Sequence, residues 1–251
     1  MAEPLKILVT NDDGIHSKGV ILLAKALREI GDVFVVAPDR EKSAIAHSLT
    51  LHRPLRVEKI KKHFWAVDGT PADCVYLGVN MILPNPPQLV VSGINKGGNM
   101  GDDVTYSGTV FAAFEGTLLG IPSFAVSLNA RSHFKFETAA RFAVRVARYI
   151  AKRGLPKDTF LNINIPNLDP KEIRSYKITG QGRWIQDGHG VEEKVDPRGR
   201  KYYWIAGGRV VFDKRGDTDI EAVSNASISI TPLHLDLTDY PSIGKMRKWK
   251  L

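Results

Sequence analysis

The sequence has a single cysteine, Cys74, and this scarcity excludes two kinds of site. One thiol allows neither a disulfide within the chain nor a metal cluster built from several thiolates of one chain. Tyr76 and Leu77 beside it indicate a buried structural thiol rather than a nucleophile.

Long apolar runs, internal repeats and low-complexity segments are also missing. No stretch reaches the roughly 18 apolar residues of a membrane span, and residues 1–4 do not open a signal peptide. We therefore expect a cytoplasmic location and no membrane partner. With 251 residues and 43% hydrophobic content, the chain can bury one substantial core, so we expect a single domain over 1–251.

The formal net charge is +8, but the basic residues form no pattern typical of a nucleic-acid-binding surface. Most of them lie scattered or beside acids, and no predicted helix shows a basic stripe that alternates with aromatic residues. The dense basic stretch at 245–250 is interpreted as a solvated tail. We expect a small anionic substrate and no stable nucleic-acid partner.

Three common cofactor patterns are absent. The glycines at 93–98 have P-loop spacing, but Asn99-Met100 stands where Lys and Ser or Thr are required. The first predicted strand is not followed by G-x-G-x-x-G, and the seven histidines show no zinc-ligand pair at helical spacing. His47, which shares a loop with Ser43, is interpreted as a hydrogen-bonded loop residue.

Apolar runs of strand length alternate with segments of helical periodicity up to residue 166. This alternation predicts an α/β fold with a Rossmann-like, three-layer core around a parallel sheet. The predicted strands are 5–10, 33–37, 89–91, 124–126 and 160–165, and the predicted helices are 21–30, 70–81, 110–119 and 137–153. Later strand candidates are 176–179, 202–205, 210–212 and 227–230. We expect a catalytic core over 1–170 and a C-terminal antiparallel β extension, or arm, over 171–251.

Two adjacent carboxylates, Asp12 and Asp13, directly follow the first predicted strand. In an open parallel sheet, the ligand site lies outside the carboxyl ends of the strands. Neighbouring carboxylates repel each other, and a bound divalent cation would compensate their charge. Because Asp and Gly also favour turns, Asp12-Asp13-Gly14 is equally explained as a chain reversal, and both explanations can hold together.

Polar segments also follow the next two predicted strands. Residues 39–44 include a hydroxyl, two acids and two bases, and residues 95–103 are rich in glycines whose N–H groups can approach an anion. Ser107-Gly108-Thr109 then precedes a predicted helix, a position that binds phosphate through hydroxyls, N–H groups and the helix dipole. Together these features predict metal-assisted phosphoester chemistry.

Five ordered motifs resemble the SurE family of stationary-phase survival nucleotidases. They are VTNDDG (9–14), VAPDR (36–40) with Ser43 and His47-Ser48, GTPADCV (69–75), SGIN (92–95) with GNMG (98–101), and YSGTV (106–110). Similarity continues at 162–166 and 229–233. The resemblance implies a Rossmann-like core, one divalent cation per subunit (Mg²⁺ or Mn²⁺), hydrolysis of nucleoside 5′- or 3′-monophosphates, and a homodimer or tetramer joined through the C-terminal arm.

The resemblance also implies individual roles. The cation would be held by Asp12, Asp13, Ser43 and Asn95. The phosphate would face Asn99 and the turn formed by Ser107, Gly108 and Thr109. Asp13 is selected as the group that accepts a proton from the attacking water, with an aspartyl-phosphate intermediate as the alternative.

Some expectations stay open. Many relatives carry Thr-Arg-Gln where this chain has Thr179-Gly180-Gln181, with the nearest arginine at Arg183, so the role of that arginine is open here. A polyphosphate-directed phosphatase and a non-catalytic nucleotide- or RNA-binding protein are the alternative functions. The adjacent acids favour an enzyme, because without a cation they would repel a phosphate. In the arm, Tyr202, Tyr203, Trp204 and Phe212 are expected to pack against a second subunit or, alternatively, on the chain's own sheet.

Overall fold

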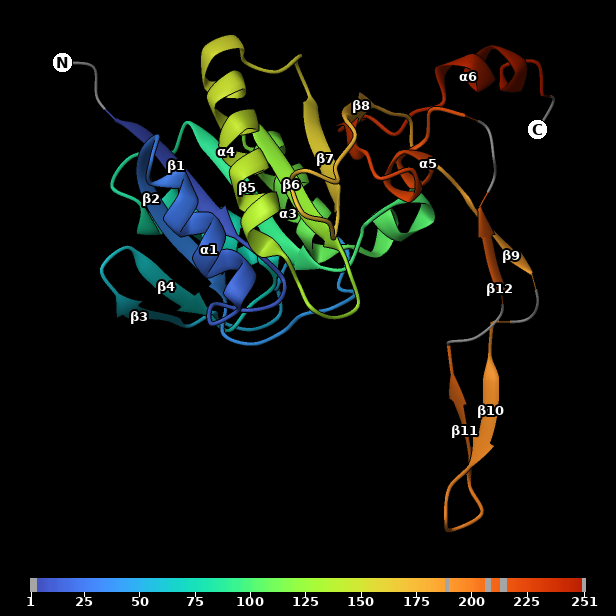
Figure 1. Ribbon diagram of the computed structural model, residues 1–251. Helices are drawn as coiled ribbons and strands as arrows, with labels where there is room; N and C mark the ends of the chain where they lie inside the picture. Colours follow the sequence, from blue (N-terminus) through green and yellow to red (C-terminus); the bar gives the residue numbers. More distant parts are fainter. Residues whose placement is uncertain (1–3, 188–189, 206–208, 213–215, 250–251) are drawn as a thin grey trace.

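The structure, a computed structural model, describes residues 4–187, 190–205, 209–212 and 216–249. Its centre is a nine-stranded sheet with the order β3-β4-β2-β1-β5-β6-β7-β13-β8 (Figure 1). The six strands from β4 to β7 in this order run parallel to one another. They are β4 (Phe64–Val67), β2 (Gly31–Pro38), β1 (Leu5–Thr10), β5 (Leu89–Lys96), β6 (Ser123–Asn129) and β7 (Thr159–Pro166).

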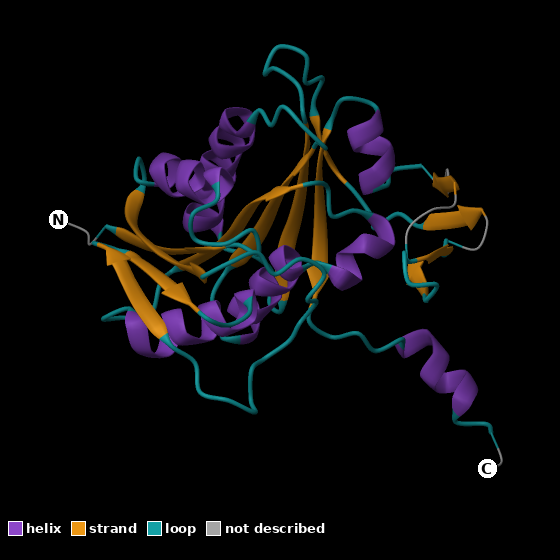
Figure 2. Ribbon diagram, turned by 90° about the horizontal axis from the view of Figure 1, so that it is seen from below, coloured by secondary structure: helices purple, strands orange, loops and turns teal. Residues whose placement is uncertain are grey.

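Helices cover both faces of the sheet, which gives the expected three layers (Figure 2). On one face lie α1 (Lys18–Leu27) and α4 (Phe136–Arg153), and on the other lie α2 (Pro71–Leu77) and α3 (Gly108–Leu118). In β1, Ile7 and Val9 belong to the core beneath α1 and α4, whereas Leu8 belongs to the core beneath α2 and α3. Burial on both faces explains why the parallel strands are continuous apolar runs.

The second core contains Cys74, which is completely buried, as predicted. Burial raises the pKa of its thiol well above the ordinary value, which disfavours the reactive thiolate. Thr70 begins α2 with a capping box, because its side chain accepts from the Asp73 N–H while the Asp73 carboxylate accepts from the Thr70 N–H. The predicted helix over 70–81 is thus α2 followed by a π-helical turn, η1 (Gly78–Ile82).

The sheet edges differ from the sequence-based prediction. At one edge, β3 (Val57–Lys61) pairs antiparallel with β4; all five of its residues are exposed, so it lacks the apolar pattern of a buried strand. At the other edge, β13 (Ile228–His234) pairs antiparallel with β7, and β8 (Tyr176–Ile178) pairs parallel with β13. Two C-terminal strands therefore extend the main sheet, because Ile228 and Ile230 pack into the core beneath α4.

The other C-terminal strand candidates form antiparallel ribbons outside the sheet. One joins β9 (Trp184–Asp187) to β12 (Arg209–Phe212), and the other joins β10 (Glu192–Val195) to β11 (Lys201–Trp204), which extends away from the core in Figure 1. Tyr202, Tyr203 and Trp204 are exposed, and the Phe212 side chain lies outside the described part of the structure.

Two short helices, α5 (Asp219–Ser224) and α6 (Tyr240–Met246), complete the described elements. Residues 219–224 follow Thr218, whose side chain accepts from the Glu221 N–H and so begins α5. Within the described residues, none of the helices has the length and apolar character needed to cross a membrane.

Candidate active site

The polar segments that follow the parallel strands meet at one edge of the sheet and line a cavity of about 340 Å³. β2 lies on one side of β1 and β5 on the other, so the order in which strands are added reverses at β1. Ligands bind at such a reversal in open parallel sheets. Six of the residues predicted to form the site line the cavity. They are Asp12, Asp13, Ser43, Asn95, Asn99 and Ser107.

Asp12 is held by the N-terminus of α3. The Thr109 hydroxyl donates to Asp12 Oδ1, and the Thr109 N–H donates to Oδ2 at 3.2 Å. Gly108 permits this approach, since a Cβ there would lie 3.1 Å from the Asp12 Cβ and 2.9 Å from Ile45 Cγ2. Gly108 and Thr109 therefore lie beside the Asp12 carboxylate, which Thr109 orients. The phosphate contact expected for these two residues stays a prediction.

Burial raises the pKa of Asp12 from 3.8 to about 6, opposed by the Thr109 hydrogen bond and increased by the charge of Asp13. Burial also raises the pKa of Asp13, while Lys96 lowers it and Glu41 raises it. The Lys96 N–H donates to Asp13 Oδ2 at 3.2 Å, and Lys96 Nζ lies 3.6 Å from Oδ1. Lys96 of β5 thus supplies part of the compensating positive charge, yet the pKa values of both carboxyls stay above the ordinary 3.8.

The donor set fits a hard divalent cation. Ser43 Oγ donates to Glu41 Oε1 at 2.6 Å, which leaves the lone pairs of its oxygen available. Asn95 Nδ2 donates to the Gly97 carbonyl at 3.0 Å, so Asn95 Oδ1 is the atom available to a cation. With the two aspartates, these oxygens match the preference of Mg²⁺ and Mn²⁺. The fit rests on two carboxylates and neutral oxygens, since no group of three or more His, Cys, Asp or Glu residues suited to a metal occurs in the described residues.

Asn99 is fixed by buried polar residues of β6 and β7. Its Nδ2 donates to Ser127 Oγ at 2.8 Å, and its N–H donates to Asn164 Oδ1 at 2.7 Å. Its carbonyl accepts from Asn162 Nδ2 at 2.8 Å and from Asn164 Nδ2 at 2.9 Å. Sequence reasoning missed this support, although two asparagines within an otherwise apolar strand were a signal for it.

The remaining predicted residues have defined roles in the loops. Ser107 Oγ accepts from the Val110 N–H at 3.1 Å and begins α3, which leaves its hydroxyl hydrogen available to an anion in the cavity. His47 Nε2 lies 2.7 Å from Oε2 of the buried Glu115, and its ring stacks on Phe111 with centroids 5.5 Å apart. The interpretation of His47 as a hydrogen-bonded loop residue is confirmed, and it ties the loop that carries Ser43 to α3.

Sequence reasoning assigned no role to four further polar or charged side chains on the cavity wall. They are Glu41, Lys96, Asp103 and Tyr106. Burial raises the pKa of Asp103, and the charges of Asp102 and Asp219 add to this effect. All four belong to segments that the sequence had already placed near the site, but only the folded chain shows which of their side chains face the cavity.

The C-terminal segment supports the same wall at η2 (Gly101–Tyr106). Gln181 Nε2 donates to the Gly101 carbonyl at 2.8 Å, and the Gly101 N–H donates to Asp219 Oδ2 at 3.0 Å. The Trp184 N–H donates to Asp102 Oδ2 at 3.0 Å. Gly180 stands where many relatives have the arginine of Thr-Arg-Gln. The next residue, Gln181, contacts η2 at this point.

Two other cavities, of about 350 and 410 Å³, lie against α4 and are both larger than this one. Neither is lined by adjacent carboxylates. The chemistry of the lining residues, rather than the volume, therefore identifies the cavity at β1 and β5 as the candidate active site.

Comparisons with known proteins agree with this assignment. A sequence profile of the family described as "Survival protein SurE" matches residues 7–187. The chain is 54% identical to the 5′-nucleotidase SurE of Geobacter sulfurreducens over 248 residues, which are 98% of this chain and 94% of that protein. It is also 54% identical to the protein of that name from Pelobacter propionicus over 246 residues, 98% of this chain and 99% of that protein. The crystal structure of the SurE protein from Aquifex aeolicus matches with a TM-score of 0.87 and 44% identity, covering 96% of this chain and 98% of that one.

Proposed function

The chain belongs to the SurE family, and we propose that it is a metal-dependent 5′-nucleotidase that hydrolyses nucleoside 5′-monophosphates to nucleoside and phosphate. The observation that carries the proposal is the pair of buried carboxylates, Asp12 and Asp13, beside the Ser107 hydroxyl in one cavity. Buried acids with raised pKa values and no full counter-charge are suited to hold a cation, and a cation would in turn attract a phosphate.

The site residues have distinct roles in the proposed reaction. Asp12, Asp13, Ser43 and Asn95 would hold one Mg²⁺ or Mn²⁺, which when bound supplies a Lewis acid and a more acidic water. Asp13 accepts the proton of the attacking water, and Lys96 stays beside it. Ser107 and the loop that contains Asn99 donate hydrogen bonds to the phosphate oxygens. Thr109 keeps the Asp12 carboxylate oriented through both of its oxygens.

The test is release of inorganic phosphate from a panel of 5′- and 3′-mononucleotides and linear polyphosphate, in chelator and with Mn²⁺ or Mg²⁺. We expect activity on 5′-monophosphates only with metal, and a loss of at least about 100-fold for Asp13→Asn. The matched control is Asp39→Asn, since Asp39 is an exposed acid after β2 that does not line the cavity. Full activity in chelator, or an active Asp13→Asn variant beside an equally active control, contradicts the proposal.

We also propose that the protein forms a homodimer or tetramer through its C-terminal arm. All of α6 is exposed or partly exposed, and a helix of 7 residues has little stability without a packing partner. Light scattering on the full chain and on a chain that ends at Thr238 tests this, because the cut removes α6 and keeps β13. A monomeric full chain, or a truncated chain with the same mass per particle, contradicts an oligomer built through α6.

A further inference from the structure

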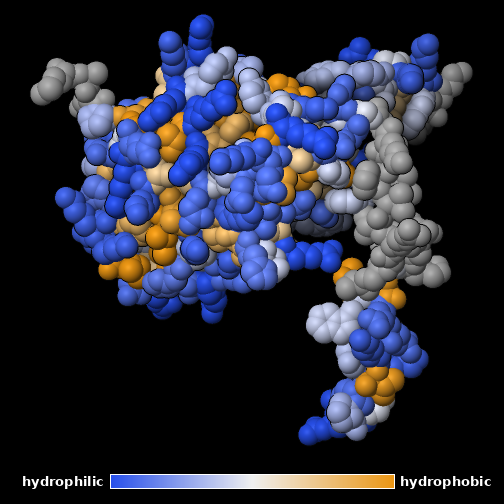
Figure 3. All heavy atoms as spheres, in the orientation of Figure 1, coloured by the Kyte–Doolittle hydropathy of each residue, from blue (hydrophilic) through white to orange (hydrophobic). Residues whose placement is uncertain are grey.

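On the face of the sheet that bears α1 and α4, four cations lie along one side of α4. Arg141, Arg145, Arg148 and Lys152 follow one another at intervals of four, three and four residues, a spacing that places them on the same helix face. At the rise of an α-helix they extend over about 16 Å. Hydrophilic residues cover this part of the surface in Figure 3, with apolar residues between them.

Most of this charge lacks compensation. Together these cations line the two cavities of about 350 and 410 Å³, which share Arg141 and Arg145. Glu29 is the one carboxylate among the described residues of either lining, and it pairs with Arg148 at 3.4 Å. Arg141, Arg145 and Lys152 form no ion pair within the part of the chain that the structure describes. Since like charges on one helix face repel each other, an anion is the complementary ligand.

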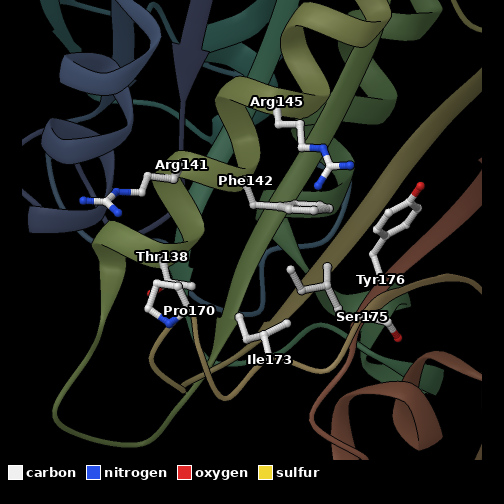
Figure 4. Close-up of a pocket in the computed structure, with 9 residues that line it drawn as sticks. Thr138, Arg141, Phe142, Arg145, Pro170, Ile173, Ser175 and Tyr176 are labelled. Atoms are coloured by element: carbon white, nitrogen blue, oxygen red, sulfur yellow. The ribbon is translucent and has the colours of Figure 1, made fainter.

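Aromatic rings lie among the cations. Phe142 on α4 and Tyr176 on β8 have ring centroids 6.3 Å apart, and the Arg145 guanidinium lies 5.3 Å from the Tyr176 ring centroid. Figure 4 shows Arg145 extending toward Tyr176, whereas Arg141 points to the opposite side of the cavity. Tyr176 is 50% exposed, and Tyr149, which lines the second cavity, is 67% exposed. Partly exposed aromatic rings thus lie beside cations that form no ion pair in the described residues.

We propose that this face of α4, defined by Arg141, Arg145, Lys152, Tyr149 and Tyr176, binds a short single-stranded oligonucleotide. A cationic track beside exposed aromatic rings binds single strands with little sequence preference, since phosphates pair with the cations and bases stack on the rings. A duplex keeps its bases stacked inside and does not offer them to these tyrosines. A mononucleotide would use only one of the two cavities.

This inference is independent of the proposed nucleotidase activity, because none of the five residues lines the catalytic cavity. It also differs from the sequence-based expectation of no basic stripe among aromatic residues and no nucleic-acid partner. All four cations lie within the helix predicted over 137–153, so their spacing was present in the sequence. Tyr176, in contrast, reaches them from a strand 31 residues after Arg145, and only the folded chain brings this ring to the cations.

The test is fluorescence anisotropy of a 12-nucleotide oligo-uridylate, labelled at its 5′ end, with the full protein in chelator. We expect binding that weakens with salt. Arg141→Ala/Arg145→Ala should raise Kd at least about tenfold and reduce the slope of log K against log salt by about 1.4, or 0.7 for each lost phosphate contact. Arg153→Ala is the matched control, since Arg153 is on the same helix but lines neither cavity. Tyr176→Ala should raise Kd about fivefold or more without changing the slope.

Several outcomes would overturn the proposal. These are absence of binding at micromolar protein, equal Kd values for the double variant and Arg153→Ala, and displacement of the oligonucleotide by a mononucleotide that fills the catalytic cavity. Equal competition by base-free polyphosphate of the same length would exclude the stacking contribution. A change in particle mass of the double variant by light scattering would show instead that this face joins two copies of the chain. Thermal unfolding of each variant confirms that it is folded before its Kd is interpreted.

Discussion

Asp12→Asn should stabilise the metal-free protein at alkaline pH, although it removes a candidate metal ligand. Burial places the pKa of Asp12 at about 6 in the folded chain, against 3.8 ordinarily. Because the folded value is the higher one, Asp12 contributes its stability in full below about pH 4, and this contribution is lost as the pH rises through 6. Asparagine has no charge to lose, so the variant escapes that loss.

The magnitude follows from the same values. At pH 5 the folded carboxyl is about one unit below its pKa, so the remaining contribution is about 1–2 kcal/mol, and at pH 8 it is close to zero. The unfolding free energy of Asp12→Asn relative to the wild type should thus increase by about 1–2 kcal/mol between pH 5 and pH 8. The two contacts with Thr109 persist, since an amide accepts from the Thr109 N–H and donates to its hydroxyl oxygen.

The assay is thermal unfolding of both proteins in chelator at pH 5 and pH 8. The difference in Tm should widen by about 3–5 °C, and saturating Mn²⁺ at pH 8 should reverse the order, because two carboxylates bind a cation more tightly than one. Asp39→Asn should follow the wild type throughout. A Tm difference that stays constant with pH, or an Asp12→Asn variant less stable than the wild type at pH 8 in chelator, would refute the reasoning.

Three further substitutions test the supports of the site. Thr109→Val removes the hydroxyl that donates to Asp12, and we expect kcat/KM to fall about 10- to 100-fold, equally for all nucleotides. A loss confined to nucleotides of one base would contradict a role through Asp12. Asn164→Ala removes the acceptor of the Asn99 N–H and one of the two donors to its carbonyl, so urea unfolding should show a loss of about 2–4 kcal/mol in unfolding free energy. An unchanged midpoint would exclude the network as a support. His47→Leu leaves Glu115 buried without its partner, so calorimetry should show a loss of about 3 kcal/mol or more, and a stable variant would contradict the anchoring role.

The sequence predicted the layers of the fold well because burial on both faces leaves a direct signal. Runs such as 5–10 and 160–165 are apolar since both sides of the strand face helices. The edge strand β3 carried no such signal, since only one neighbour fixes it. The C-terminal strands were predictable as strands but not in their pairing, because joining β7 depends on packing beneath α4.

The same distinction holds for the site. Asp12 and Asp13 were predictable, since a strand end followed by two acids is a local pattern. Lys96 was not assigned, because it meets Asp13 only through the pairing of β1 with β5. The role of Thr109 depends on the position of the α3 N-terminus, which lies against the Asp12 carboxylate. No local sequence pattern shows which anionic group a helix N-terminus will contact. The identity of the metal, the cytoplasmic location and the boundary at residue 170 stay predictions.

Hydrogen bonds join the residues before position 170 to those after it. Asp219 accepts hydrogen bonds from Gly101 at the start of η2 and from Gly182 in the C-terminal segment, so it joins the two parts. Asp219 is completely buried, and burial raises its pKa, so these N–H donors are what keep its carboxylate acceptable within the fold. Since η2 carries Asp103 and Tyr106 into the cavity, the shape of the site depends on Asp219, which is 118 positions from Gly101 in the sequence. The C-terminal residues thus complete the candidate active site, besides any part they take in an oligomer.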